Sequence, residues 1–156
     1  MSTALSLESR LQRLEDEKQI RELMIEYGRR LDARDFRGYA RLFAGEGEWI
    51  GGLGRAKGPA AIEAMLVKGL GSIAANPQTV TSFHILTNFQ IEVTGDRASA
   101  YSRLLYVIRS AEDTPAPSRG GHYEDLFIRE DGGWKFLRRV VLGDIPTQDV
   151  LAARPA

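Results

Sequence analysis

Apolar residues in the first part of the chain recur at helical spacing. Between residues 9 and 32 they lie mostly three or four positions apart, or at sums of these, which predicts one long amphipathic helix. These residues are Leu11, Leu14, Ile20, Leu23, Met24, Tyr27 and Leu31. Ser9 followed by Gln12 fits a capping box at the start of this helix.

Shorter elements are expected next. Residues 35 to 43 predict a second helix, and residues 48 to 50 predict a brief strand followed by a glycine-rich turn. Gly58 and Pro59 open a third helix that extends to about Leu70, because proline suits the first turn of a helix.

The second half of the chain changes to a period of two, which is typical of strands. Residues 81 to 93 alternate, and His84 falls on the face opposite the main apolar set. That apolar set is Phe83, Ile85, Phe89, Ile91 and Val93. Further strands are expected at residues 97–109, 122–129 and 134–142, with a proline-containing loop at 111–119.

Helices followed by an antiparallel meander predict an α+β fold. We expect a cone-shaped α+β barrel in which the N-terminal helices pack into a curved antiparallel sheet. The length of 156 residues suggests a single domain, here residues 1–142, followed by a C-terminal tail at 143–156.

Composition excludes several classes of function. There is no cysteine, so thiolate catalysis, disulfides and cysteine-ligated zinc are ruled out. With 21 basic and 21 acidic side chains, the chain has no charge excess that would favour nucleic acid or an anionic membrane. No apolar run approaches the roughly 20 residues that span a bilayer, and the N-terminus lacks a secretion signal, so we expect a cytoplasmic protein.

The candidate chemistry centres on Asp32 and His84. A histidine oriented by a carboxylate is a general base near neutral pH, since the pKa of free imidazole is about 6.5. Asp32 at the end of the long helix could reach His84, and Tyr27 could border the same cavity. The alternatives stay open here: Asp32 as a solvated helix-end residue, His84 as a surface histidine and Tyr27 as a core aromatic. Asp35 is expected to cap the second helix.

Other candidates would line a pocket around this pair. Trp49 and Tyr106 are expected in the core or the pocket wall. His122 is a second acid–base candidate, although His122 and Tyr123 must point to opposite sides of their strand. Arg138 is the substrate-binding candidate of the pair Arg138-Arg139, of which one guanidinium could point inward and would need a partner there or an anionic substrate. No metal-ligand spacing and no cofactor-binding motif is present, so we expect neither a metal nor an organic cofactor.

From about residue 10 to residue 142 the chain resembles the SnoaL-like branch of the nuclear transport factor 2-like superfamily. The stretches that carry the resemblance are residues 17–36, 42–48, 58–62, 84–88, 95–96, 121–129 and 133–138. Within the branch, the positions of Tyr27, Asp32 and His84 resemble those of the bile-acid 7α-dehydratases. Residues 48–59 are similar to hexachlorocyclohexane dehydrochlorinase, which shares Asp32 and His84 but has a lysine in place of Tyr27. Scytalone dehydratase is a more distant relative with a similar His–Asp arrangement.

These relatives imply cofactor-free elimination in a conical pocket, commonly in a homo-oligomer, with a trimer favoured over a dimer. The hypothesis is a dehydratase or dehydrohalogenase in which His84 abstracts a C–H proton from a small hydrophobic substrate, with polycyclic compounds among the candidates. Two alternatives remain: a non-catalytic ligand-binding module, and an isomerase that uses the same base.

Overall fold

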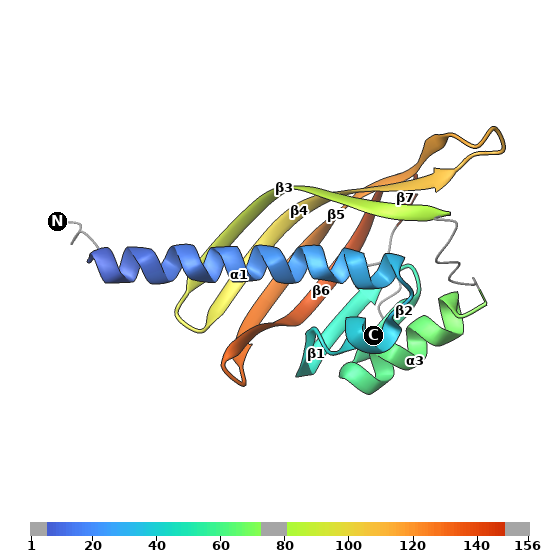
Figure 1. Ribbon diagram of the computed structural model, residues 1–156. Coiled ribbons are helices and arrows are strands. Elements are labelled where there is room, and N and C mark those ends of the chain that lie inside the picture. Colours follow the sequence, from blue (N-terminus) through green and yellow to red (C-terminus); the bar gives the residue numbers. More distant parts are fainter. Residues whose placement is uncertain (1–5, 73–80, 149–156) are drawn as a thin grey trace.

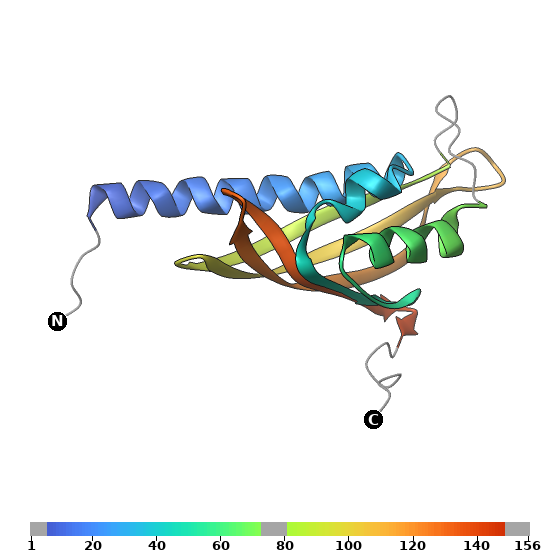
Figure 2. The same cartoon turned by 90° about the horizontal axis from the view of Figure 1, so that it is seen from below.

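Three helices lie against one face of a curved seven-stranded sheet in the computed structural model, which describes residues 6–72 and 81–148 (Figures 1 and 2). The helices are α1 (Leu7–Asp32), α2 (Phe36–Ala40) and α3 (Pro59–Leu70). The strands are β1 (Phe43–Gly51), β2 (Gly54–Lys57), β3 (Ser82–Thr94), β4 (Arg97–Arg109), β5 (Pro115–Glu130), β6 (Gly133–Ile145) and β7 (Thr147–Gln148). The α+β fold expected from the order of periodicities is confirmed.

The sheet has the strand order β2-β1-β6-β5-β4-β3, with β7 paired to β6. Strands β3 to β6 form the expected antiparallel meander. Among the described strands, the sheet departs from the expected antiparallel arrangement only where β1 runs parallel to β6. β1 forms an antiparallel hairpin with β2, but α3 and the meander strands β3 to β5 separate it in sequence from β6, so the pair β1–β6 can be parallel.

Helix α1 crosses the sheet and extends beyond its edge (Figure 1). Its buried side is formed by Asp16, Ile20, Met24, Tyr27 and Gly28. Leu11 and Leu14 were expected on this side but are 56% and 62% exposed, because the first turns of the helix project past the strands. The cap is Ser6, whose hydroxyl accepts a hydrogen bond from the Ser9 backbone, rather than the expected Ser9.

A β-bulge in β3 reverses the faces that simple alternation predicts. Thr87 lies opposite Arg103 and Gln90 lies opposite Tyr101, so β3 contains one more residue than β4 across this stretch. Asn88 has a φ of 54°, a left-handed conformation that asparagine tolerates better than most residues.

The bulge determines where His84 points. On one side of it Phe83 and Ile85 face outward, and beyond it Phe89, Ile91 and Val93 pack on the core. The side chains of His84 and Leu86 therefore share the inner face with Phe89, Ile91 and Val93, and the predicted grouping of Phe83 and Ile85 with the core set is wrong.

Several element ends also differ from the predictions. The second helix ends at Ala40, and Phe43 already begins β1. Gly54, expected to end the glycine-rich turn, already begins β2, which the sequence pattern did not predict. Residues 115–119 were expected in a loop because they contain two prolines, which lack a backbone N–H donor, but they pair with β4. The last strand continues to Ile145, and residues 147–148 form β7, so the part of the expected tail that is described belongs to the sheet. Residues 149–156 of that tail lie outside the described residues.

Aromatic side chains from the helices and the sheet meet in the core. Tyr27 packs against Tyr39, Tyr123 and Phe136, with ring centroids 4.4 to 5.7 Å apart. Such contacts stabilise the core beyond the burial of area alone. None of the helices among the described residues is long and apolar enough to span a membrane.

Candidate active site

A cavity of about 530 Å³ opens between the helices and the inner face of the sheet. It is lined by Tyr27, Leu31, Arg34, Tyr39, Trp49, Gly52, Leu53, Leu66, Leu70, His84, Leu104, Tyr106, Arg119, Gly120, Gly121, Tyr123, Val141, Leu142 and Gly143. Most of the wall is apolar or aromatic, which is typical of pockets for small organic ligands. The cavity is large enough for a molecule of one to several rings.

His84 is held by the Asp32 carboxylate at the edge of this cavity. Asp32 Oδ1 lies 2.6 Å from His84 Nδ1, and Asp32 Oδ2 accepts a hydrogen bond of 3.1 Å from the His84 backbone N–H. A carboxylate oxygen accepts hydrogen bonds, so Nδ1 carries the ring proton and donates a hydrogen bond to Asp32. The other ring nitrogen, Nε2, makes no hydrogen bond to any described residue and is free to accept a proton.

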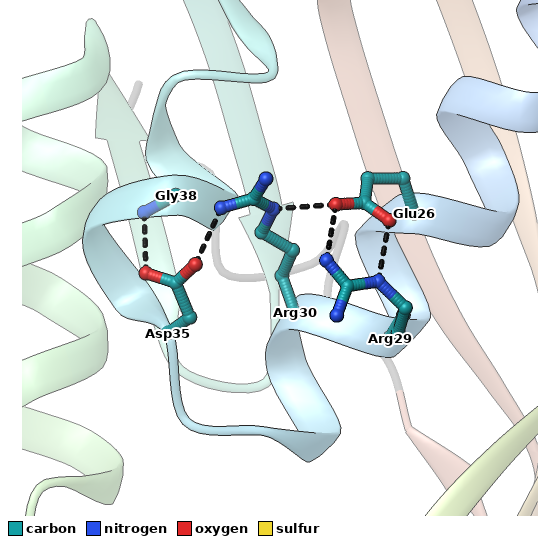
Figure 3. Close-up of polar contacts among 5 residues, drawn as sticks. All are labelled: Glu26, Arg29, Arg30, Asp35 and Gly38. Carbon is teal, nitrogen blue, oxygen red and sulfur yellow. Dashed lines mark hydrogen bonds and ion pairs between the residues drawn. The ribbon is translucent and has the colours of Figure 1, made fainter.

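A polar network fixes the end of the helix that carries Asp32 (Figure 3). Glu26 accepts hydrogen bonds from Arg29 and from Arg30 Nε, at 2.6 Å and 2.7 Å. Arg30 Nη1 also donates to Asp35 at 2.5 Å, and Asp35 caps α2 by accepting from the Gly38 backbone. The expected capping role of Asp35 is confirmed, and because Asp32 lies between Arg30 and Asp35 in the chain, the network restricts its position.

The network also shifts the pKa of two of its carboxyl groups. The hydrogen bond from Arg29, followed by that from Arg30, lowers the pKa of Glu26 to about 2. The hydrogen bond from the Gly38 backbone and the contact with Arg30 lower the pKa of Asp35. Both groups are therefore ionised at neutral pH and keep their arginine partners.

Tyr106 forms the surface next to the histidine. It lies directly opposite His84 on the neighbouring strand, and the two rings have centroids 4.7 Å apart. The His84 side chain is only 14% exposed, so the ring is shielded by its neighbours while it still borders the cavity. A ligand in the cavity would lie against Tyr106 and within reach of the imidazole.

Three tyrosine hydroxyls supply polar groups to the buried part of the cavity. Tyr27 accepts a hydrogen bond of 3.1 Å from the Trp49 indole, which leaves the Tyr27 proton available for donation. The Tyr39 hydroxyl is fully buried and has no hydrogen-bond partner among the described residues. Burial, followed by the proximity of Tyr27, raises the pKa of both Tyr39 and Tyr123 well above the ordinary value for a tyrosine. Tyr39 and Tyr123 therefore stay neutral and can donate hydrogen bonds to a ligand.

A buried ion pair lies beneath this aromatic wall. Arg139 donates from Nε and Nη2 to the two oxygens of Asp125 at 2.7 Å and 2.6 Å, and both side chains are fully buried. The Arg139 guanidinium carbon lies 3.9 Å from the ring centroid of Tyr27 and 4.0 Å from that of Tyr123. Burial by itself would lower the pKa of Arg139, but the attraction of Asp125 raises it above its ordinary value.

The structure brings five of the seven predicted site residues together. Tyr27, Trp49, His84 and Tyr106 line the cavity, and Asp32 contacts His84 from behind. The other two residues, His122 and Arg138, belong to the opposite face of the sheet and do not line the cavity.

Alternation explains the correction for His122. A bulge explains the correction for Arg138, because β6 contains one more residue than β5 between Phe136 and Arg138. His122 packs on Tyr101 and contacts Asp144 at 2.9 Å, whereas its neighbour Tyr123 points into the cavity. Arg138 lies near Glu48 at 3.9 Å, and the inward guanidinium is that of Arg139, with Asp125 as the partner that a buried charge requires.

Sequence reasoning missed Tyr39, Arg34 and Arg119 in the cavity wall. Tyr39 was assigned only to the apolar side of the second helix, and Arg119 was assigned to a loop. Arg34 follows the end of α1 in a left-handed conformation, with a φ of 58°, that no sequence pattern indicated. For Tyr123, alternation showed that it lies on the face opposite His122, but the sequence could not show which of the two faces lines the cavity.

Metal binding finds no support in the part of the chain that the structure describes. No group of three or more histidine, cysteine, aspartate or glutamate side chains there is placed to hold a metal ion.

Comparison with known proteins identifies the family of the domain. Residues 12–140 match the SnoaL-like domain. An NTF2-like protein with a cystatin-like fold from Novosphingobium aromaticivorans is 28% identical, with a TM-score of 0.79, over 100% of this chain and 99% of that one.

Two further solved structures are similar to this chain. A putative scytalone dehydratase from the same species is 26% identical, with a TM-score of 0.69, over 85% of this chain and 86% of that one. LinA is 24% identical, with a TM-score of 0.73, over 87% of this chain and 90% of that one, a similarity that concerns the fold alone. No curated protein matches the chain.

Proposed function

Because this chain belongs to the SnoaL-like domain family, we propose that it is a cofactor-independent lyase that uses His84 as a general base. The observation that carries the proposal is the contact of 2.6 Å between Asp32 and His84 Nδ1 at the edge of a largely apolar cavity. Some structural relatives support an elimination reaction, among them the putative scytalone dehydratase.

In the proposed reaction, His84 Nε2 removes a proton from a carbon next to a carbonyl or another activating group. The Asp32 carboxylate keeps the proton on Nδ1 and stabilises the imidazolium that forms. The electrons of the broken C–H bond form the C=C bond, and the bond from the adjacent carbon to a hydroxyl or halide breaks. Base catalysis of this kind contributes about 10²–10⁴-fold, so positioning in the cavity supplies the remaining acceleration.

Tyrosine hydroxyls are the proposed donors to the leaving group. Tyr27 accepts from Trp49 and so directs its own proton elsewhere. The Tyr39 hydroxyl, which has no hydrogen-bond partner among the described residues, is a second donor, since a buried hydroxyl of this kind gains most from a polar group on the ligand. A departing hydroxide leaves as water with a proton that solvent supplies through the tyrosine hydroxyl, which stays neutral. His84 returns its own proton to solvent after the product has gone, so no net proton is consumed.

The test is a reaction screen in D₂O with monocyclic and bicyclic β-hydroxy ketones and their β-chloro analogues. Loss of water or of HCl, detected by NMR and mass spectrometry and absent in His84→Gln, is the expected result. Deuterium uptake at the α-carbon without loss of the leaving group would favour an isomerase that uses the same base. Binding of these compounds without either reaction would favour a ligand-binding module and contradict the lyase proposal.

A further inference from the structure

The charged residues in the cavity wall are of one sign. Arg34 and Arg119 line the cavity, and no aspartate or glutamate of the described residues lines it. The chain as a whole has 21 basic and 21 acidic side chains, so this imbalance is local to the cavity. Arg119 is exposed where the cavity meets solvent and Arg34 is half-buried, and their positive potential favours an anionic ligand over a neutral one of the same shape.

Neither arginine is neutralised by another part of the described chain. Arg34 donates from Nη1 only to the Leu31 carbonyl, at 3.2 Å. Arg119 makes no hydrogen bond and no ion pair with any described residue. Asp32, the carboxylate behind His84, already accepts two hydrogen bonds from that residue. The arginines therefore retain donors for a ligand.

Arg119 lies in register with the proposed base. His84 is directly opposite Tyr106 on β4, and Tyr106 is directly opposite Arg119 on β5. Residues that lie opposite one another on adjacent strands project from the same face, and neighbouring strands are about 4.8 Å apart. The three residues thus form a row across the sheet: a base, an aromatic surface and a cation, with roughly 10 Å between the backbones at its two ends.

This row matches a substrate with a flat apolar body and one anionic end. A ring placed over Tyr106 would have one side at His84 and the other toward Arg119. Arginine suits a carboxylate at the second position, because the planar guanidinium donates two parallel hydrogen bonds to its two oxygens.

We propose that the substrate is a cyclic carboxylate whose ring lies over Tyr106, whose acidic C–H faces His84 and whose carboxylate binds Arg119. Arg34 adds positive potential to the same cavity. This inference rests on the proposed lyase function for the role of His84, but the carboxylate site itself can be measured by binding alone.

The experiment compares 2-naphthoate with 2-naphthamide, which have nearly the same shape and differ in charge. Isothermal titration calorimetry is carried out on the wild type, Arg119→Gln, Arg119→Lys and Arg103→Gln. Arg103 is the matched control, because it pairs with Asp144 on the opposite face of the sheet and its replacement removes the same charge from the protein.

In the wild type we expect naphthoate to bind roughly tenfold or more tightly than the amide, as a charge-assisted bidentate contact allows. Arg119→Gln should abolish this preference, Arg119→Lys should retain part of it, and Arg103→Gln should leave it unchanged. Equal binding of the two compounds, no detectable binding of naphthoate, or a preference that survives Arg119→Gln would overturn the inference.

Failure of this inference is distinguishable from failure of the proposed function. The carboxylate preference should persist in His84→Gln, which lacks the base but keeps Arg119. Elimination from neutral substrates without any preference for a carboxylate would contradict the carboxylate site at Arg119 but support the proposed lyase function. An Arg119-dependent preference in a protein without lyase activity would support the carboxylate site and remove the proposed reaction.

Discussion

Asp32 binds His84 twice, through the backbone N–H with one carboxylate oxygen and through the imidazole Nδ1 with the other. The two residues are 52 positions apart, at the end of α1 and near the start of β3. Binding the backbone as well as the ring fixes the carboxylate relative to the strand, so the ring cannot turn without losing its contact with Asp32. The consequence is a defined tautomer with Nε2 unoccupied.

Replacing His84 by glutamine should slow turnover strongly without unfolding the protein. The side chain lies at the edge of a cavity rather than in the packed core, so the fold should persist while the rate falls by about 10²–10⁴-fold. The elimination assay measures the rate, and circular dichroism checks the fold. His122→Gln is the control, since His122 lies on the other face of the sheet and its loss should leave turnover intact; equal losses in both variants would contradict the assignment.

Asp32→Asn should shift the tautomer equilibrium of His84. An asparagine can present its NH₂ group to Nδ1, which favours the proton on Nε2 and removes the free acceptor. Long-range ¹H–¹⁵N NMR of the neutral imidazole should show a proton on Nδ1 in the wild type and an increased Nε2–H population in the variant. His122, which contacts Asp144, provides an internal reference that should not change. An unaltered His84 spectrum would count against orientation by Asp32.

Breaking the Arg139–Asp125 pair should destabilise the fold strongly. Arg139→Met leaves a fully buried carboxylate without a partner, which typically costs about 3–5 kcal/mol of unfolding free energy. Urea denaturation measures the loss, and Arg139→Met combined with Asp125→Leu should recover much of it. The neighbouring Arg138→Met should change stability by only about 0.5 kcal/mol, because that side chain is partly exposed on the other face.

The Glu26 network should contribute a stability that depends on pH. The pKa of the Glu26 carboxyl group is lowered from 4.5 to about 2 in the folded protein. Ionised Glu26 therefore stabilises the fold above about pH 4.5, and this stabilisation is lost as the pH falls toward 2. The difference in unfolding free energy between the wild type and Glu26→Gln should therefore be largest near neutral pH, at up to about 1 kcal/mol for a partly solvated pair, and shrink in acid. In an Arg29→Gln background this pH dependence should weaken. If the difference in unfolding free energy between the wild type and Glu26→Gln stayed constant down to about pH 2, the lowered pKa of Glu26 would be contradicted.

The homo-oligomer that the resemblance implies remains a prediction, with a trimer expected. Light scattering coupled to size-exclusion chromatography measures the molar mass directly. A mass of three times 17.3 kDa is the expected result, and a monomer over the working concentration range would contradict it.

Local periodicity was enough to predict the long helix and the strands of the meander, because each depends on residues close together in sequence. It failed where one residue changes the geometry. The bulge at Asn88 exchanges the faces of β3, so alternation assigned His84 to the face opposite Phe89, Ile91 and Val93 although it shares theirs. The prolines at 115 and 117 indicated a loop and thereby concealed the strand that places Arg119 opposite Tyr106.

The chemistry available to this protein was determined by sequence alone: no thiol, two histidines, and a carboxylate at a predicted helix end. The resemblance to the SnoaL-like branch selected Tyr27, Asp32 and His84 from the many polar residues of the chain. Only the tertiary structure decided that Tyr123 and Arg139 point inward while His122 and Arg138 point outward. It also decided that Arg34 and Arg119 border the cavity with no acidic partner among the described residues. The physical reason is that side-chain direction depends on strand register, bulges and packing across the sheet. These join residues far apart in the chain and leave no local pattern in the sequence.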